Sequence, residues 1–541
     1  MTSIPPMSFV EHPRIRTGTL EEREYQQRIV GTAIDHNTLA VLPTGLGKTA
    51  IALRTIAEYW LRYPERTVLF LAPTRPLVVQ HGRSVGETIL APPPFVLTGD
   101  VGPERRRRQD PGPGIWVATP QVIANDLAEG SFDLGTVSLL VFDEAHRAVG
   151  DYPYVAIGRA NQAGPNRRVL AMTASPGSRI ERIREVWANL GIERFEYRTL
   201  DDPDVQPYTH GIGVETIEVP VPPEVQHLAV RLRGAVQRQI DVLERQHLLA
   251  PGTGSRRTVL DVGQRLHREI AGVRGRNEPA PAGLWAAVTA QAAAMKGLHA
   301  LELIESQGVE ALRLFLEHQA QGTNGRRTPA QRTFLQDPDV LQVRELLTSL
   351  QLEHPKVAEA IGLVRSELEA RPQSRVIVFA QYRQTADLLV QELLGVGRAE
   401  IRPARFVGQA SRGDDSGLSQ REQVATLDRF REGGINCLVA TSVGEEGLDI
   451  PSTDLVIFYE PVPDVIRTIQ RRGRTGRVRA GRVVVLVARG TRDVGLQRGA
   501  RGRERRMHEM LKVVQAEADK GTVRPPAPRT VQQSLREFGG L

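Results

Sequence analysis

The stretch LAVLPTGLGKT, residues 39–49, decides the fold, because an apolar run of strand length leads directly into a glycine-rich loop and a helix. In this context the backbone N–H groups of the loop and the N-terminus of the helix form a binding site for phosphate. Gly45 and Gly47 let the backbone approach such a group closely. Leu42 departs from the general pattern, which has glycine there, so a plain glycine-rich turn is the alternative for this stretch taken alone.

The two residues that end the loop, Lys48 and Thr49, indicate a nucleotide site. Lys48 is the only lysine in the first 295 residues, whereas arginine supplies nearly all other basic groups in the chain. A position that retains lysine favours a compact ammonium over a planar guanidinium. We predict that Lys48 bridges the β- and γ-phosphates of ATP, that the Thr49 hydroxyl ligates Mg²⁺, and that Thr44 belongs to the same loop.

Apolar runs of strand length alternate with helical stretches on both sides of this loop. Their continuous apolar character indicates parallel strands that are buried on both faces. They are LAVLP (39–43), VLFLAP (68–73), FVLTG (95–99), IWVATP (115–120), LLVFDEA (139–145) and RVLAMTAS (168–175). The alternation predicts a doubly wound α/β domain.

The strand pattern stops after about residue 205 and resumes near residue 375, in RVIVFAQ. Between them lie long stretches rich in Ala, Leu, Gln and Arg with helical periodicity. We therefore predict a leader, a first α/β domain, a helical insertion, a second α/β domain and a C-terminal part with a basic helix and a Pro-rich tail. Their expected bounds are 1–17, 18–221, 222–355, 356–500 and 501–541.

Composition narrows the class of protein. The 541 residues include 70 Lys plus Arg against 63 Asp plus Glu, a net charge of +7 that suits a polyanionic partner without requiring one. A single cysteine, Cys437, excludes an internal disulfide, a four-cysteine zinc site and an iron–sulfur cluster. No apolar run has the length of a signal peptide core or a membrane span. We expect an intracellular protein associated with chromosomal DNA and not with a membrane.

The run LLVFDEAH places two carboxylates, Asp143 and Glu144, at the end of a predicted strand, where ligands of parallel sheets bind. Asp143 can hold the Mg²⁺ coordination shell, and Glu144 can orient or deprotonate an attacking water. His146 can relay the state of the γ-phosphate to a neighbouring segment. Taken alone, the four letters also fit the solvated start of a helix with acidic capping residues.

The second half contains QRRGRTGR, residues 470–477, which puts Arg474 and Arg477 on one helical face. Two guanidiniums on one face can bind a single phosphate when the two α/β domains close. Gly447 and Asp449, in ATSVGEEGLDIP, follow another predicted strand. A basic surface face is the alternative for the arginine pair.

In its order of segments the chain resembles the superfamily 2 helicases. The matches are REYQQ (23–27) for the Q motif, LPTGLGKT for motif I, APTRPLVVQH (72–81) for Ia, VATPQ (117–121) for Ib, DEAH for II, TAS (173–175) for III, VIVFAQYR (376–383) for IV, ATSVGEEGLDIP for V and QRRGRTGR for VI. The resemblance implies two RecA-like domains with ATP and Mg²⁺ between them. It implies an adenine contact at Gln26, a catalytic role for Gln470, and coupling through Thr173 and Ser175.

Further segments, such as DPDVQPY (202–208) and FVGQASRGDDSGLSQREQ (406–423), are similar to the helicase half of archaeal Hef and the Fanconi anaemia M proteins. This resemblance implies ATP-driven remodelling of branched DNA, such as stalled forks and Holliday junctions. The XPF-type nuclease cluster ERKxxxD of Hef is not found here, so we expect no nuclease activity and consider a separate nuclease partner. The helicases of the RIG-I and Dicer branch, which act on duplex RNA, are the nearest alternative.

Nucleic-acid contacts should be mainly to phosphate, since a translocase must tolerate every sequence. The family motifs assign such contacts to Arg75, Thr119, Gln121, Arg383 and Thr441. Residues 256–276 carry six arginines against two acidic residues. They can either grip an arm of a junction or form a solvated helix face.

The last residues contain Gln532, Leu535 and Phe538 at the Q-x-x-L-x-x-F spacing of a motif that docks on the PCNA sliding clamp. The preceding Pro-rich stretch suits a tether. An unstructured tail is the alternative, because Gly539 follows Phe538 where a second aromatic residue is expected. A clamp-tethered DNA-binding scaffold with an ATP-switched grip is therefore a further possible function.

Overall fold

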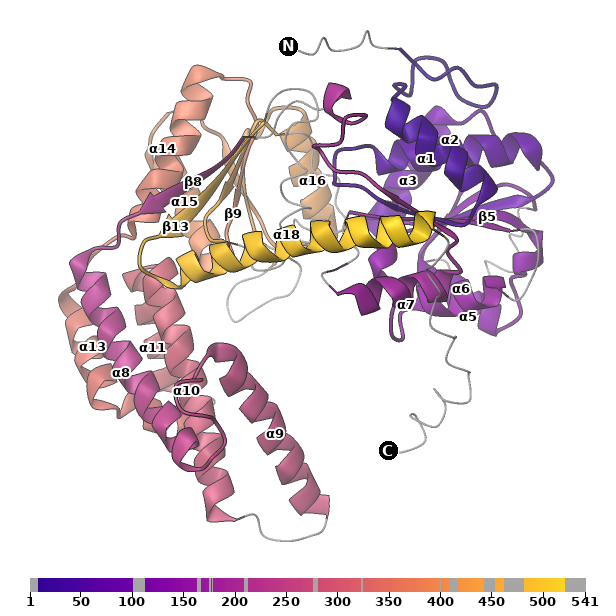
Figure 1. Cartoon of the computed structure of the whole chain (residues 1–541). Helices are drawn as coiled ribbons and strands as arrows, with labels where there is room; N and C mark the ends of the chain where they lie inside the picture. The colour runs from indigo at the N-terminus through magenta and orange to yellow at the C-terminus, as the bar shows by residue number, and fades with distance from the viewer. Residues whose placement is uncertain are drawn as a thin grey trace.

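Two parallel sheets joined by a helical region form the protein (Figure 1). The computed structural model describes residues 8–100, 112–162, 167–174, 177, 179–208, 213–275, 281–322, 325–398, 400–408, 417–441, 453–461 and 481–520. The predicted fold class, two α/β domains with a helical domain between them, is confirmed. Within these ranges no helix is long and apolar enough to span a membrane.

The first sheet has seven parallel strands in the order β3-β4-β2-β5-β6-β1-β7. Their bounds are β1 (Thr38–Val41), β2 (Thr67–Leu71), β3 (Phe95–Leu97), β4 (Ile115–Ala118), β5 (Val137–Phe142), β6 (Arg168–Thr173) and β7 (Arg194–Tyr197). The central strands β1, β2 and β5 are buried along their whole length, as their continuous apolar runs predict.

Helices cover both faces of this sheet because each contributes an apolar stripe to one of two cores. One core contains residues of α1 (Glu24–Asp35), α2 (Lys48–Arg62) and α3 (Arg75–Thr88). The other contains residues of α5 (Pro120–Ala128), α6 (Pro153–Gln162) and α7 (Ile180–Leu190). The arrangement is the doubly wound one that the sequence predicts.

The second sheet has six parallel strands in the order β10-β11-β9-β12-β13-β8. Their bounds are β8 (Gly213–Val219), β9 (Val376–Phe379), β10 (Pro403–Phe406), β11 (Cys437–Ala440), β12 (Leu455–Phe458) and β13 (Arg482–Ala488). Helices α14 (Pro355–Ala370) and α15 (Arg383–Gly395) pack on one face, and α16 (Gln420–Arg431) packs on the other.

Strand β8 corrects the expected domain boundary. We expected the first domain to extend to residue 221, but β8 pairs in parallel with β13 along its whole length. Two ion pairs accompany this pairing, between Glu215 and Arg482 and between Glu218 and Arg489. The chain therefore completes one strand of the second sheet before it enters the helical insertion.

The insertion consists of helices, as predicted. They are α8 (Pro223–Arg245), α9 (Arg256–Gly275), α10 (Ala282–Ser306), α11 (Val309–Gln321), α12 (Pro329–Leu335) and α13 (Pro338–Ser349). Gly297 of α10 allows a close approach of α8, because a Cβ atom at this position would lie 2.6 Å from Cγ2 of Val236. Two apolar cores, one at each end of α8, hold the bundle together.

Helix α18 (Arg492–Asp519) connects the second domain to the first (Figure 1). Its last turns place Met507, Leu511, Val514 and Ala518 in the same core as α7 and β7. The Tyr197 backbone N–H at the end of β7 donates a 3.0 Å hydrogen bond to Oε1 of Gln515. We expected a basic helix only from residue 501; the helix begins at 492 and packs on the opposite domain.

A buried polar cluster joins the insertion to the second sheet. Lys356, at the start of α14, is fully buried and forms an ion pair with Asp493, at the start of α18. Asp493 also accepts hydrogen bonds from Oγ of Ser306, at 2.8 Å, and from the Ala488 backbone N–H, at 3.1 Å. The cluster thus connects the ends of α10 and β13 with the beginnings of α14 and α18.

Replacing Lys356 with Met should destabilise the protein by about 3–5 kcal/mol, because Asp493 would remain buried without its cation. Chemical denaturation followed by circular dichroism measures the change. Lys512→Met, on the exposed side of α18, is the control and should change the free energy of unfolding by less than about 0.5 kcal/mol. Equal stabilities of the two variants would contradict the role of this ion pair.

The same cluster gives a pH dependence. Burial raises the pKa of the Glu460 carboxyl to about 7, against the opposing charge of Lys356 and the hydrogen bond from Gln307. The folded protein then binds a proton more tightly than the unfolded chain, whose Glu pKa is about 4.3. Through this group the free energy of unfolding should therefore fall as pH rises from about 4.3 to 7, by on the order of 4 kcal/mol.

Glu460→Gln removes this titration, so the variant should gain stability relative to the parent at pH 8 and lose that advantage near pH 5. Thermal unfolding at both pH values measures the difference. Glu432→Gln, at an exposed position, should leave the pH dependence unchanged. A constant difference between Glu460→Gln and the parent at the two pH values would refute the assignment.

Candidate functional site

The predicted site residues of the first domain follow the carboxyl ends of neighbouring strands. Because all strands are parallel, these ends meet at one edge of the sheet. In spatial order the edge carries Thr119 after β4, Arg75 after β2, Asp143 after β5, Thr173 at the end of β6, and the glycine-rich loop after β1. The strand order therefore separates the residues that we predict to bind the nucleotide from those that we predict to bind nucleic acid.

Two glycines of the glycine-rich loop adopt the left-handed backbone conformation that glycine favours. Gly45 has φ 95° and Gly47, which precedes α2, has φ 76°. A Cβ atom on Gly47 would lie 2.4 Å from Nε2 of Gln26, so a larger residue there would displace the Gln26 side chain. The Lys48 ammonium donates a 3.2 Å hydrogen bond to the Leu42 carbonyl and thereby lies over the loop.

Gln26, the predicted adenine contact, lies directly against this loop. It is 2% exposed, and its Nε2 donates a 3.1 Å hydrogen bond to the Leu46 carbonyl. The Tyr25 hydroxyl donates to the same carbonyl at 2.8 Å. Within the described residues Oε1 of Gln26 is buried and accepts no hydrogen bond, so it can accept one from a nucleotide base.

Asp143 is held by groups on both sides of its carboxylate. Oδ2 lies 2.9 Å from Nε2 of His81, and Oδ1 accepts a 3.0 Å hydrogen bond from the Glu144 backbone N–H. Burial opposes the charged form, but the contact with His81 and the charge of Lys48 outweigh it and lower the pKa of Asp143. The carboxylate is therefore ionised at neutral pH, as a ligand of Mg²⁺ must be.

His81 is a site residue that the sequence analysis did not identify. It lies on α3, is 3% exposed and stacks on Phe70, with ring centroids 4.4 Å apart. The available signal was a histidine on the buried face of a helix that follows a strand end. This signal is weak, because a satisfied core histidine has the same pattern.

Glu144 and His146 lie beside Thr173. Glu144 adopts a left-handed backbone, with φ 50° and ψ 47°, which is rare outside glycine and turns its side chain out of the strand direction. Oε2 of Glu144 lies 3.3 Å from Nδ1 of His146, and the same nitrogen lies 3.0 Å from Oγ1 of Thr173. The predicted motif II and motif III residues are thus in direct contact.

The residues that we predict to contact nucleic acid differ in their exposure to solvent. Arg75 forms an ion pair with Asp100 at the surface, and Gln121 donates a 2.9 Å hydrogen bond to Asn125. In the second sheet Arg383 donates a 3.0 Å hydrogen bond to the Gly408 carbonyl after β10. Thr441, after β11, is only 3% exposed, so most of its side chain is covered.

Several predicted residues lie outside the described ranges. These are Ser175 of motif III, Gly447 and Asp449 of motif V, Gln470, Arg474 and Arg477 of motif VI, and the clamp-motif residues Gln532, Leu535 and Phe538. Their assignments stay predictions.

The residues at the strand edge fit Mg²⁺ bound together with ATP. Thr49 and Asp143 offer a hydroxyl and an ionised carboxylate, which are the hard oxygen ligands that Mg²⁺ prefers. No group of three His, Cys, Asp or Glu side chains gathers into a metal site in the described part of the chain.

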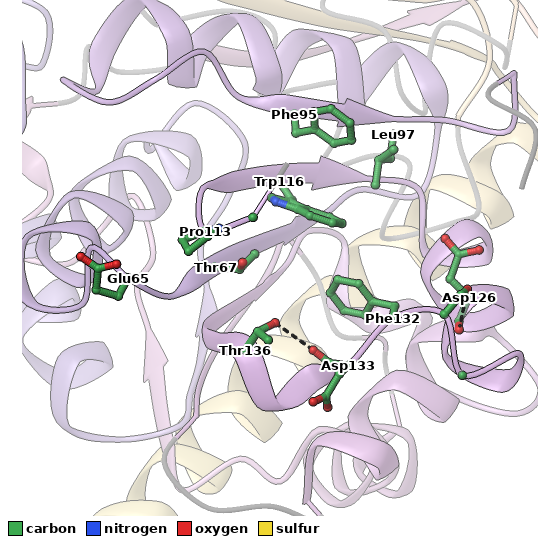
Figure 2. Close-up of a pocket in the computed structure, with 13 residues that line it drawn as sticks. Glu65, Thr67, Phe95, Leu97, Pro113, Trp116, Asp126, Phe132, Asp133 and Thr136 are labelled. Atoms are coloured by element: carbon green, nitrogen blue, oxygen red, sulfur yellow. Dashed lines mark hydrogen bonds between the residues drawn. The ribbon is translucent and has the colours of Figure 1, made fainter. Parts of the chain in front are cut away.

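A hollow of about 520 Å³ lies at the opposite edge of the first sheet (Figure 2). Phe95, Trp116 and Phe132 line it, with ring centroids 5.5 Å and 5.3 Å apart along the series. Thr67 begins β2 there, and Thr136 precedes β5. The hollow is thus separate from the loop that would bind phosphate.

Comparison with known proteins identifies the domains. Residues 23–183 match the family model "DEAD/DEAH box helicase", and residues 358–479 match "Helicase conserved C-terminal domain". Residues 224–354 match the helical bundle of a putative ATP-dependent RNA helicase. The crystal structure of the Pyrococcus furiosus Hef helicase domain is 43% identical, with a TM-score of 0.66 over 87% of this chain and 97% of that one. The chain belongs to the Hef helicase family.

Curated relatives of this Hef-family chain are longer proteins. A putative ATP-dependent RNA helicase of Methanocaldococcus jannaschii is 37% identical over 93% of this chain and 62% of its own length. An ATP-dependent DNA helicase of Pyricularia oryzae is 33% identical over 87% of this chain and 44% of its length. The Fanconi anemia group M protein homolog of Mus musculus is 32% identical over 87% of this chain and 25% of its own length. The chain spans at most 62% of these relatives.

His81→Ala should lower the apparent affinity for Mg²⁺ in ATP hydrolysis by about 10–100-fold, because Asp143 loses the group that orients it. The rate of phosphate release measured against Mg²⁺ concentration tests this. His227→Ala, at an exposed position of α8, is the control. If both variants need the same Mg²⁺ concentration as the parent, His81 does not position Asp143.

Proposed function

We propose that the chain is an ATP-dependent DNA helicase or translocase that remodels branched DNA, such as stalled forks and Holliday junctions, in DNA repair. One observation carries the proposal: the glycine-rich loop after β1 and the two carboxylates after β5 share one sheet edge, with only β6 between their strands. Membership of the Hef family supports branched DNA as the substrate.

The residues of the first domain would hold and hydrolyse ATP. Lys48 would contact the β- and γ-phosphates, and Thr49 and Asp143 would hold Mg²⁺, which neutralises phosphate charge when bound. Glu144 would orient or deprotonate the attacking water. Its contact with His146, and that of His146 with Thr173, transmits the state of the γ-phosphate to the end of β6.

The second domain would complete the site only on closure. Gln470, Arg474 and Arg477 supply groups that stabilise the negative charge of the transition state, while Gly447 and Asp449 contact the nucleotide. ATP binding then closes the cleft and hydrolysis reopens it, so that each cycle moves the chain along the phosphate backbone. Arg75, Thr119, Gln121, Arg383 and Thr441 form the nucleic-acid contacts.

Duplex RNA is the second candidate substrate. The relative from M. jannaschii carries RNA in its printed name, and so does the family model of the helical bundle. The relatives from P. oryzae and Schizosaccharomyces pombe are named as DNA helicases. Electrostatic contacts to phosphate can be made with either nucleic acid.

The deciding experiment measures ATP hydrolysis at fixed salt without nucleic acid and with a forked DNA, a linear DNA duplex or an RNA duplex of matched length. We expect the fork to raise the rate at least tenfold over linear DNA and RNA. Lys48→Ala is the blank and should reduce hydrolysis by at least 100-fold while it keeps DNA binding. Equal or greater stimulation by duplex RNA would overturn the choice of DNA.

The C-terminal residues Gln532, Leu535 and Phe538 would recruit the protein to chromosomal DNA through the PCNA sliding clamp. A separate nuclease would cut the junctions that the motor exposes. The Q-x-x-L-x-x-F spacing supports the clamp as a partner, and the resemblance to Hef supports the nuclease.

A further inference from the structure

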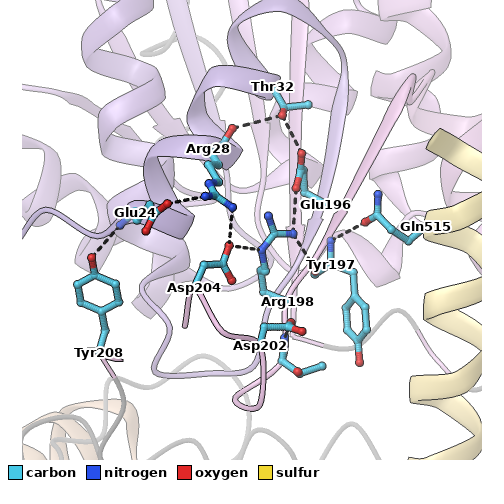
Figure 3. A network of polar contacts seen from close by, with 11 residues as sticks. Glu24, Arg28, Thr32, Glu196, Tyr197, Arg198, Asp202, Asp204, Tyr208 and Gln515 are labelled. Carbon is cyan, nitrogen blue, oxygen red and sulfur yellow. Dashed lines mark hydrogen bonds and ion pairs between the residues drawn. The ribbon is translucent and has the colours of Figure 1, made fainter. Parts of the chain in front are cut away.

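A chain of polar contacts runs from α18 to α1 (Figure 3), and α1 in turn contacts the nucleotide loop. It begins where Gln515 accepts the hydrogen bond from the Tyr197 backbone N–H at the end of β7. It ends at α1, whose Tyr25 and Gln26 both donate to the Leu46 carbonyl of the loop. Because α18 begins in the second domain, this chain of contacts connects that domain to the residues that bind ATP.

Arg198 and Asp204 form the middle of this chain. Nε of Arg198 donates a 3.0 Å hydrogen bond to Oδ2 of Asp204, and Nη1 donates to the Tyr197 carbonyl at 2.9 Å. The Asp204 and Arg198 side chains are 13% and 18% exposed. An ion pair with this degree of burial is screened less by water than a surface pair, so it fixes geometry more strongly.

Two contacts attach this centre to α1. Nη1 of Arg28 lies 3.6 Å from Oδ2 of Asp204, the same oxygen that Arg198 binds. The Thr32 hydroxyl donates a 2.7 Å hydrogen bond to Glu196, whose other oxygen accepts from Arg198 at 3.2 Å. Arg28 and Thr32 are one turn apart on α1, so β7 and the segment after it hold one side of the helix at two points.

The N-terminus of α1 is held by the same segment. The Tyr208 hydroxyl accepts a 3.2 Å hydrogen bond from the Glu24 backbone N–H. The Tyr208 ring packs edge-on against Tyr25, with centroids 5.9 Å apart. Residues 198–208 therefore fix both the position of α1 along its axis and the rotation that points Gln26 at the loop.

We propose that Asp204 is a positioning residue for ATP: through Arg28 and Arg198 it holds α1, and with it Gln26, in register with the strand on which α18 is anchored. Asp204 does not touch the nucleotide loop itself. It acts by joining Arg28 and Arg198, which also pair with Glu24 and Glu196 respectively. This inference rests on the proposed function, since it assumes that the loop binds ATP.

The test compares Asp204→Asn, which removes the charge but keeps the shape, with Asp204→Glu, which keeps the charge. Asp201→Asn is the matched control, because Asp201 is a neighbouring exposed aspartate. Asp204→Asn should raise the KM for ATP and the Kd of a fluorescent ATP analogue about 5–10-fold, with less than a twofold change in kcat. Asp204→Glu should restore at least half of the lost affinity.

Gln515→Ala tests the connection to α18. If both residues act through the same series of contacts, the double variant Asp204→Asn with Gln515→Ala should lose no more ATP affinity than the single variant that has the larger loss. Fully additive losses would overturn the connection. Unchanged ATP affinity in Asp204→Asn, or an equal loss in Asp201→Asn, would overturn the role of Asp204.

A purely structural role is recognised by a different result. It would lower the thermal unfolding temperature and kcat together and leave KM unchanged, which would also overturn the inference. The binding measurement separates this inference from the proposed function. If the parent protein binds the ATP analogue but does not hydrolyse ATP, the proposed function fails, and the comparison of binding constants still decides the role of Asp204.

Discussion

The parallel pairing of the strands in both sheets is the constraint on which the other features depend. In a parallel sheet every strand needs a crossover, so helices must cover both faces and the strands must be apolar on both sides. The carboxyl ends of all strands then lie at one edge. Loops with unrelated sequences, such as the glycine-rich loop and the segment after β5, are brought together there without any direct pairing between them.

Much of this architecture could be predicted from the sequence, and the exceptions have a common cause. The strands with continuous apolar runs, such as LAVLP and LLVFDEA, occur where we expected them. Strands β7 and β8, each at one edge of its sheet, were missed because charged residues interrupt their apolar pattern. In β8, Glu215 and Glu218 pair with arginines after the chain has traversed the whole insertion, and no local pattern encodes such a partner.

The candidate site also combines residues that could be predicted from the sequence with contacts that could not. The roles of Lys48, Asp143 and Gln26 follow from motifs in which residue type and spacing reflect the chemistry of phosphate binding. The contacts of His81 with Asp143, and of Gln515 with Tyr197, join residues that lie 62 and 318 positions apart. Such contacts depend on how helices pack, so the sequence contains the residues but not their pairing. Helix α18 was expected as a basic helix, but its apolar face is what anchors it.

The position of β8 has a consequence for how the chain is made. Glu215 and its partner Arg482 are separated by 267 residues, so at about 5–20 residues per second the ribosome needs roughly 13–53 s to supply β13 after β8 has emerged. During this time β8 is a strand without a neighbour, the kind of segment that pairs with other chains. The glutamates that later bind Arg482 and Arg489 place negative charge on it throughout. Residues that stabilise the finished sheet thus also protect the nascent chain from aggregation.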